Sequence, residues 1–363
     1  MANDTKTYQE QTYIDNTIRL REILNTLPDF SRDYFRSIEP TTSSKTRISY
    51  AYDIRVFFQF LIDQNPVFHK YKMNDFKVHD LEKLSPVDIE EFQEYLKVYR
   101  SPENRLITNE EKGLSRKMSS LRSFYNYYYR RRIIEKNPTD LVDMPKIHEK
   151  AIIRLDIDEV ALLLDHVEHC GATLSGQALA YYNKTKERDL AILTLLLGTG
   201  IRVSECVGLN LDDVDFKNNG ITVTRKGGNQ MVIYFGDEVE KALRNYLGNT
   251  RKLTTPLPDH EDALFLSTQR KRMGVQAIEN MVKKYARQVT PNKKITPHKL
   301  RSTYGTSLYK ETGDIYLVAD VLGHKDVNTT KKHYAAIDDD RRRSAANIVK
   351  LRETLKHTET KTD

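Results

Sequence analysis

Six side chains that can bind or transform a phosphodiester lie in four short motifs in the second half of the chain. The motifs are "TGIRVSE", "TRKGG", "TPHKLR" and "LGHKDVNTTKKHY". The six residues are Arg202, Lys226, His298, Arg301, His324 and Tyr334. Each has an ordinary interpretation when taken alone, because surface arginines pair with carboxylates, turn lysines are solvated and tyrosines pack in cores. Together they suit one chemistry.

That chemistry is transesterification at a phosphodiester. Two guanidinium groups can bind the non-bridging phosphate oxygens and stabilise a pentacoordinate transition state, and such a preorganised donor is worth about 10²–10³ in rate. Histidines donate a hydrogen bond or move a proton, and a lysine can protonate the departing 5′ oxygen. Tyrosine has an ordinary pKa of about 10, and neighbouring arginines make its phenolate accessible as a nucleophile. The phosphotyrosine product conserves the bond energy.

These motifs do not contain the residue patterns that several other chemistries require. No carboxylates cluster to hold a magnesium ion, no Ser-His-Asp order suits acyl transfer, and no glycine-rich loop of Walker type is present. We therefore expect an enzyme that uses no metal and no cofactor.

The composition is typical of a soluble protein and favours a polyanionic partner. Of 363 residues, 39% are hydrophobic and 30% charged, and the formal net charge is +7. A basic balance favours nucleic acid, although a basic enzyme without such a partner has the same balance. The most apolar run, residues 190–198, is shorter than the roughly 18 residues of a membrane span. With two cysteines and no signal-peptide pattern, the protein is predicted to be cytoplasmic.

Local patterns predict the elements that carry the motifs. Alternating β-branched runs flank "KGGN" in "GITVTRKGGNQMVIYF", which predicts a hairpin with Lys226 at its tip. A threonine N-cap and a proline open the "TPHKLR" helix, so His298 and Arg301 are expected three apart on one helix face. The polar stretch 168–189 is interpreted as a long connection without an assigned role.

The first half is predicted to be helical and to contact DNA. In "TSSKTRISYAYDIRVFFQFLI", apolar residues recur at steps of four and leave a basic face, and "LSRKMSSLRSFYNYYYRRR" interleaves cations with aromatic rings. Such a surface can follow a phosphate backbone. The DNA-binding candidates are Lys45, Arg47, Arg116, Lys117 and Arg122. The alternative is an aromatic core stripe with a solvated basic back, and one helix can serve both purposes.

Changes in pattern divide the chain into five segments. Hydrophobic periodicity stops at residues 141–152, which are interpreted as a linker. This linker separates a helical region at 41–140 from a mixed region at 153–340. Residues 1–40 form an accessory helical segment, and packing is favoured over DNA reading because this segment lacks a strong basic cluster. Residues 341–363 are expected to form an amphipathic tail helix.

The motifs, in this order, resemble those of the tyrosine recombinases, the lambda-integrase-like enzymes, and are most similar to those of the Xer type. The resemblance covers about residues 150–340, and residues 41–140 resemble the family's SAM-like core-binding domain. It implies a mainly α protein with a small antiparallel β-sheet: an N-terminal helical core-binding domain followed by a mixed α/β catalytic domain.

By this resemblance, Arg202 and Arg301 form the arginine pair of the active site. Lys226 is the general acid, and Glu205 is the acidic residue that supports the site. Tyr334 is the nucleophile that becomes joined to DNA.

Two features depart from the family's usual pattern. His298 lies in the His-x-x-Arg motif and His324 at a position held by His or Trp, but Tyr334 follows His324 by ten residues where nine is common. His333 occupies the ninth position and is a far weaker candidate, so the helix carrying Tyr334 is expected to begin differently. Ser302 stands where many relatives have a second histidine.

The resemblance implies a site-specific recombinase that acts on double-stranded DNA with a recombination site. The reaction would pass through a 3′-phosphotyrosyl intermediate and a Holliday junction, within a homo-tetramer linked by the tail helices. Chromosome dimer resolution and integration or excision of a mobile element both stay open, as does activation by an accessory protein. The alternatives are a catalytically silent DNA-binding architectural or regulatory protein on the same fold, and a type IB topoisomerase-like enzyme.

Overall fold

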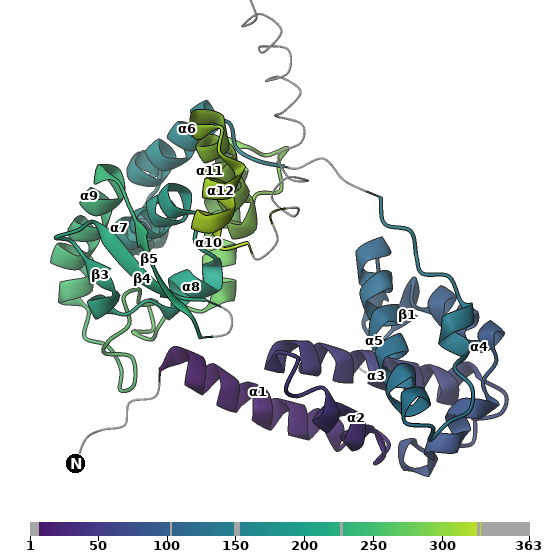
Figure 1. Cartoon of the computed structure of the whole chain (residues 1–363). Helices are drawn as coiled ribbons and strands as arrows, with labels where there is room; N and C mark the ends of the chain where they lie inside the picture. Colours follow the sequence, from purple (N-terminus) through teal and green to yellow (C-terminus); the bar gives the residue numbers. More distant parts are fainter. Residues whose placement is uncertain (1–6, 102–103, 149–152, 226–227, 325–326, 328–363) are drawn as a thin grey trace, which may run out of the picture. The chain divides into compact units, whose positions relative to one another are not determined.

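The computed structural model describes residues 7–101, 104–148, 153–225, 228–324 and 327. The chain divides into a first unit, Met1–Lys150, and a second unit, Ala151–Asp363. Each unit is described by itself (Figure 1). Lys226, Tyr334 and the predicted tail helix lie outside the described residues.

The first unit is a helical bundle with one small hairpin. Its elements are α1 (Tyr8–Leu24), α2 (Ser31–Ser37), α3 (Ser44–Gln64), α4 (Pro86–Tyr95), β1 (Val98–Arg100), β2 (Leu106–Thr108) and α5 (Glu111–Arg130). Helix α3 packs against both α1 and α5, and β1 pairs with β2 in antiparallel register. The core is aromatic: Phe57, Phe58 and Phe124 are fully buried, and the Phe57 ring meets that of Phe92 edge to face, with centroids 5.0 Å apart.

The second unit is built around one long buried helix and a small sheet. Its helices are α6 (Ile157–His169), α7 (Gly176–Thr199), α8 (Val203–Gly208), α9 (Asp237–Tyr246), α10 (Val275–Val289), α11 (Pro297–Thr312) and α12 (Ile315–Leu322). Helix α7 packs against α6, α9 and α11. Strands β3 (Val214–Asp215), β4 (Gly220–Thr224) and β5 (Gln230–Tyr234) form an antiparallel sheet in the order β3-β4-β5. The prediction of a mainly helical protein with a small antiparallel sheet is confirmed.

The polar stretch 168–189 differs from the prediction, because the first half of α7 occupies most of it. Glutamine, alanine, lysine and glutamate are good helix formers, so the segment can be helical without being apolar all round. Tyr182, Thr185 and Asp189 supply its buried face, while the lysines between them point outward or lie at the boundary.

Two glycines end the helices that lead to the candidate site. Gly200 closes α7 and Gly323 closes α12, both with φ of +63° in the left-handed region where glycine is favoured. At Gly200 a Cβ would also lie 2.4 Å from the ring of Tyr304, so no side chain fits there. In the part of the chain that the structure describes, no helix is both long and apolar enough to cross a membrane.

Candidate active site

Arg301 lies in the second turn of α11 and joins two other helices. The threonine N-cap and first-turn proline of α11 are present as predicted. The Arg301 side chain is buried, with 5% exposure, and its Nη1 donates to the Gly200 carbonyl at 2.6 Å. Its Nη2 donates to the Leu322 carbonyl at the end of α12. The partial negative charge at a helix C-terminus offsets part of the cost of burying this cation.

Arg202 lies at the N-cap of α8 and is held by one carboxylate. Its Nη1 is 2.8 Å from Glu205 Oε1, and its backbone N–H donates to Glu205 Oε2 at 2.7 Å. The Glu205 side chain is buried, whereas that of Arg202 is 38% exposed. Arg202 Nη2 also donates to the Gly323 carbonyl, at 3.3 Å. The guanidinium therefore stays accessible from one side while Glu205 fixes the other.

A third arginine, Arg225, also lies at the end of α12 and was not among the sequence candidates. It directly follows β4, and its backbone N–H donates to the Asn229 carbonyl at 2.8 Å, which closes the hairpin turn. Its Nη2 donates to the Val321 carbonyl at 2.8 Å and its Nη1 to the Asp320 carbonyl at 3.4 Å. Burial lowers the pKa of the Arg225 guanidinium, the Glu205 carboxylate opposes this shift, and the positive charge of Arg202 adds to it.

The C-terminal end of α12 thus anchors three guanidinium groups from three separate segments. Arg202 follows α7, Arg225 follows β4, and Arg301 belongs to α11, yet all three bond to carbonyls within residues 320–323. Carbonyl dipoles hold these cations without cancelling their net charge. The cluster is an anion-binding arrangement of a kind that suits a phosphate.

The two candidate histidines flank this cluster in the chain. His298 is exposed in the first turn of α11, one turn before Arg301. His324 directly follows Gly323, is half-buried, and donates its backbone N–H to the Ala319 carbonyl at 2.8 Å. Lys226 is the residue after Arg225, and Tyr334 lies ten residues beyond His324; neither is among the described residues.

In the first unit, three of the DNA-binding candidates are bonded to carboxylates. Arg47 is buried, with its Nη1 2.6 Å from Glu39 Oε1. Lys117 is buried beside Asp53, at 3.0 Å, and Arg116 bonds to the same carboxylate while staying about half exposed. Asp53 lies more than sixty residues before Arg116 and Lys117 in the chain, so local sequence patterns do not predict this pairing.

The other two first-unit candidates differ from each other. Arg122 donates to the carbonyls of Thr139 and Val142 and so ties α5 to the segment that follows it. Lys45, in the first turn of α3, is exposed. Sequence reasoning also missed Arg19 of α1, whose Nη2 donates to the Tyr52 hydroxyl of α3 at 3.0 Å.

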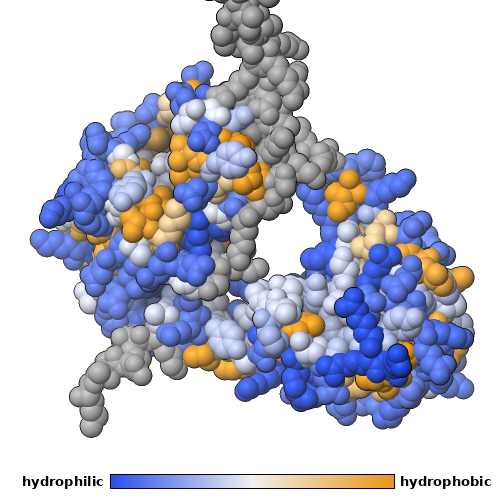
Figure 2. Space-filling view, in the orientation of Figure 1, coloured by the Kyte–Doolittle hydropathy of each residue, from blue (hydrophilic) through white to orange (hydrophobic). Residues whose placement is uncertain are grey.

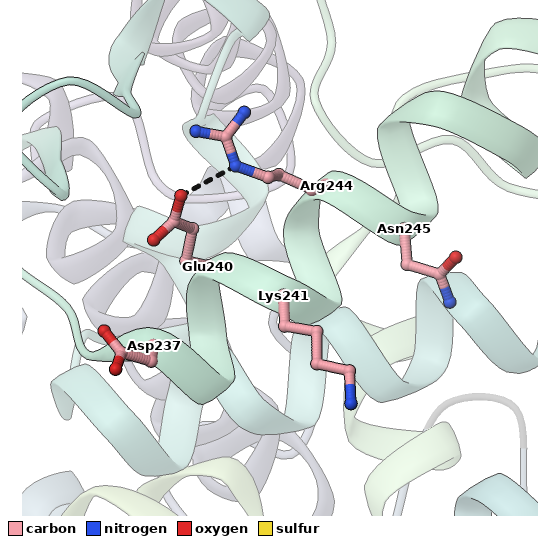
Figure 3. A pocket seen from close by; sticks show the side chains of 5 residues that line it. All are labelled: Asp237, Glu240, Lys241, Arg244 and Asn245. Atoms are coloured by element: carbon pink, nitrogen blue, oxygen red, sulfur yellow. Dashed lines mark hydrogen bonds and ion pairs between the residues drawn. The ribbon is translucent and has the colours of Figure 1, made fainter.

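A separate hollow on α9 has a different character. Figure 3 shows that it is lined by Asp237, Glu240, Lys241, Arg244 and Asn245. Glu240 and Arg244 pair with each other at 2.7 Å, and the Arg244 guanidinium also lies over the Phe216 ring. Its mixed and mutually paired charges give no reason to treat it as part of the phosphate-binding arrangement.

Comparison with known proteins agrees with the motif order. Residues 154–341 match the model of the Phage integrase family. The tyrosine recombinase XerC of Caldanaerobacter subterraneus subsp. tengcongensis is 34% identical over 328 residues, covering 87% of this chain and 84% of that protein. The tyrosine recombinase XerS of Streptococcus mutans serotype c is 31% identical over 353 residues, covering 89% of this chain and 96% of that protein.

Solved structures share the fold. The XerH recombinase in its post-cleavage complex with a palindromic difH substrate aligns with a TM-score of 0.61 at 18% identity, covering 84% of this chain and 79% of that one. The Tn1549 transposon integrase in complex with a circular intermediate DNA aligns with a TM-score of 0.61 at 20% identity, covering 87% and 98%. The predicted resemblance is confirmed, and the chain belongs to the phage integrase family as a relative of the Xer tyrosine recombinases.

Proposed function

We propose that this recombinase breaks and rejoins DNA at a specific site through Tyr334, with Arg202 and Arg301 holding the scissile phosphate. Site-specific recombination is the activity that family membership supports. The residue roles rest on one observation: guanidiniums from separate segments meet at the end of α12, next to His324 and just before the segment that carries Tyr334.

The proposed cleavage step is a transfer of one phosphoryl bond. The Tyr334 phenol oxygen attacks the phosphorus, its proton passes to His298, and the bond from phosphorus to the 5′ oxygen breaks. Lys226 gives its proton to that 5′ oxygen. Arg202 and Arg301 stabilise the added negative charge in the transition state, and His324 donates a hydrogen bond to the phosphate.

The rejoining step reverses this chemistry with a different strand. A free 5′ hydroxyl from the partner duplex attacks the 3′-phosphotyrosyl bond and releases Tyr334, and one round of exchange leaves a Holliday junction. Since bond energy is kept in the protein–DNA ester, no step in this scheme requires ATP. Glu205 supports the scheme indirectly, because its carboxylate holds Arg202 in position before DNA binds.

In the first unit, we assign direct DNA contact to exposed Lys45 and half-exposed Arg116. Arg47, Lys117 and Arg122, which the sequence also suggested, would act mainly by fixing the helices that present those contacts. The carboxylates offset the charges of Arg47 and Lys117, and the carbonyl bonds of Arg122 direct its guanidinium toward the segment after α5.

We further propose that the protein acts in the cytoplasm as a homo-tetramer on two recombination sites. Figure 2 shows apolar side chains on the second unit over α11 and α12, and Tyr316 and Leu317 of α12 are exposed at 71% and 40%. A tail helix with apolar residues at Ile348, Leu351 and Leu355 could cover such a surface on a neighbouring copy.

The proposed cellular task is chromosome dimer resolution, with its link to chromosome partition and cell division, or integration and excision of a mobile element. An accessory protein that activates cleavage would fit either task.

Covalent trapping tests the proposal. Wild type, Tyr334→Phe and the matched control Tyr234→Phe, a change at an exposed tyrosine, are incubated with labelled genomic DNA fragments in EDTA and quenched with SDS, and the attached DNA is sequenced. We expect DNA with recurring ends on wild type and Tyr234→Phe, and none on Tyr334→Phe. An adduct on Tyr334→Phe would remove Tyr334 from the mechanism. Strand exchange between two recovered sites, rather than relaxation of supercoils, separates a recombinase from a topoisomerase-like enzyme.

A further inference from the structure

The Arg225 side chain fastens the β4–β5 hairpin to α12. Its guanidinium crosses from the end of β4 to the last turn of α12, where it bonds to the carbonyls of Asp320 and Val321. Its backbone also defines the turn, because the Gly228 N–H donates to the Arg225 carbonyl at 3.0 Å. The same residue therefore shapes the hairpin tip and joins it to the arginine cluster.

The contact is so close that a side chain at Gly323 would have to displace the Arg225 guanidinium. A Cβ built on Gly323 would lie 1.7 Å from Arg225 Nη1 and 2.2 Å from its Cζ. The guanidinium consequently packs directly on the Gly323 backbone, so Gly323 serves two purposes. It provides the left-handed conformation that ends α12, and it leaves the space that Arg225 occupies.

Placing a partly buried arginine at position 225 is unfavourable for folding. Its Nε is buried without a hydrogen-bond partner among the described residues, and burial lowers its pKa. A desolvated, partly unsatisfied cation next to Arg202 opposes folding, and an apolar side chain of similar size would avoid that cost. A contribution to folding stability therefore does not explain an arginine at this position, whereas its place between the hairpin and α12 does.

We propose that Arg225 is a positioning residue for cleavage, a latch that fixes the hairpin tip against the end of α12. Residue 226 follows Arg225 directly, and consecutive Cα atoms are about 3.8 Å apart, so anchoring Arg225 restricts where the lysine can lie. Gly323 is likewise followed by His324. The latch therefore brings the general acid and His324 to the same phosphate. This inference rests on the proposed role of Lys226.

The test compares two leaving groups in single-turnover cleavage. Duplexes carry the sequence recovered with wild-type protein, with either oxygen or sulfur at the 5′ bridging position of the scissile bond. A thiolate leaves without a proton, so sulfur compensates for a missing or misplaced general acid. We expect Arg225→Ala to slow cleavage of the oxygen substrate by about 10²-fold, the cost of misplacing a catalytic group by about 1 Å. We expect the sulfur substrate to recover most of this loss, and DNA affinity to fall by no more than the loss of one cation from the cluster.

Further variants isolate the latch from general effects. Arg225→Lys should recover part of the rate because a cation can still reach one carbonyl, and Arg225→Gln serves if the alanine variant unfolds. Arg244→Ala, on the outer face of α9, should cleave both substrates like wild type. Arg225→Ala/Lys226→Ala should be no slower than Lys226→Ala alone, because both changes remove the same proton transfer.

The outcomes separate the latch from the role of Lys226. If sulfur restores Lys226→Ala but not Arg225→Ala, or if the double variant shows additive losses, the latch is overturned and the general acid stands. If sulfur restores neither, Lys226 is not the acid and the latch falls with it. Restoration of both variants, with no added loss in the double variant, supports the proposal.

Discussion

Buried basic residues in the two units are held in two ways, by carboxylates or by backbone carbonyls. In the first unit, Arg47 and Lys117 are paired with the carboxylates of Glu39 and Asp53. In the second unit, buried Arg188 likewise pairs with the Asp189 carboxylate, whereas buried Arg301 bonds to the backbone carbonyls of Gly200 and Leu322. A carboxylate cancels the charge that it holds, whereas a carbonyl orients the charge and leaves its net value unchanged.

This difference indicates what each group of cations is for. Paired cations in the first unit join helices, and they contribute little to the field that DNA meets. Carbonyl-held cations in the second unit keep their charge available and are already oriented before a phosphate arrives, which is the arrangement that stabilises a transition state. The same residue type therefore serves architecture in one unit and, in our proposal, chemistry in the other.

The largest expected effect comes from Arg301→Lys. Lysine keeps the charge but cannot bond to both the Gly200 and Leu322 carbonyls, so cleavage should fall by about 10²–10³-fold. The measurement is single-turnover cleavage of a nicked site. The matched control is Arg188→Lys, because Arg188 is equally buried but pairs with the Asp189 carboxylate. That control should lose thermal stability and keep its rate while folded; equal rate losses would place Arg301 among the architectural residues.

Asp53→Asn should produce the largest change in stability. It leaves the buried Lys117 ammonium without its carboxylate, which costs about 3–5 kcal/mol in unfolding free energy. Chemical denaturation of wild type and variant measures the loss. Replacing both residues, as Asp53→Leu/Lys117→Met, should recover much of it, since no buried charge is then left unpaired. A double variant no more stable than the single one would contradict this account of the pair.

Glu205→Gln tests the comparison of carboxylate-held and carbonyl-held cations at Arg202, which bonds to both kinds of partner. The amide can still accept one hydrogen bond but loses the ionic component, so we expect cleavage to slow about tenfold, equivalent to about 1.4 kcal/mol. Glu240→Gln, which disturbs the exposed pair with Arg244 on α9, is the control and should cleave like wild type. Similar losses from both variants would mean that the effect is not specific to the arginine cluster.

The smallest effect is expected at the first unit's surface. Lys45→Ala should weaken DNA binding for all sequences and reduce the salt slope of log affinity by about 1, as the loss of one phosphate contact does. Arg47→Ala should leave that slope unchanged, because its charge is paired with Glu39. Affinity measured over a series of salt concentrations decides between them, and a reversed order would refute our division of these residues.

Features determined by neighbouring residues were predictable from the sequence. The hairpin follows from alternating residues around "KGGN", and the start of α11 follows from its threonine cap and proline. The segment 168–189 was misread because its first turns are polar on most sides, and only packing against the rest of the unit reveals the buried face of α7.

Features determined by distant partners were not predictable in this way. Arg225 read as one more turn residue, because its partners lie almost a hundred residues away in α12. The carboxylate partners of Arg47 and Lys117 could not be predicted for the same reason, since a basic residue on a helix gives no sign of a carboxylate elsewhere. The identities of Arg202, Arg301 and Glu205 could be chosen from motif order, but their meeting at one helix end required the fold.

Anchoring several guanidiniums on the last turn of α12 makes the site cooperative. Fraying that one turn would break bonds made by Arg202, Arg225 and Arg301 together rather than one at a time. The chain leaving this turn is also the chain that leads to Tyr334, the proposed nucleophile. A half-assembled site would then be less active, and a recombinase gains protection against isolated, unpartnered cleavage from that behaviour.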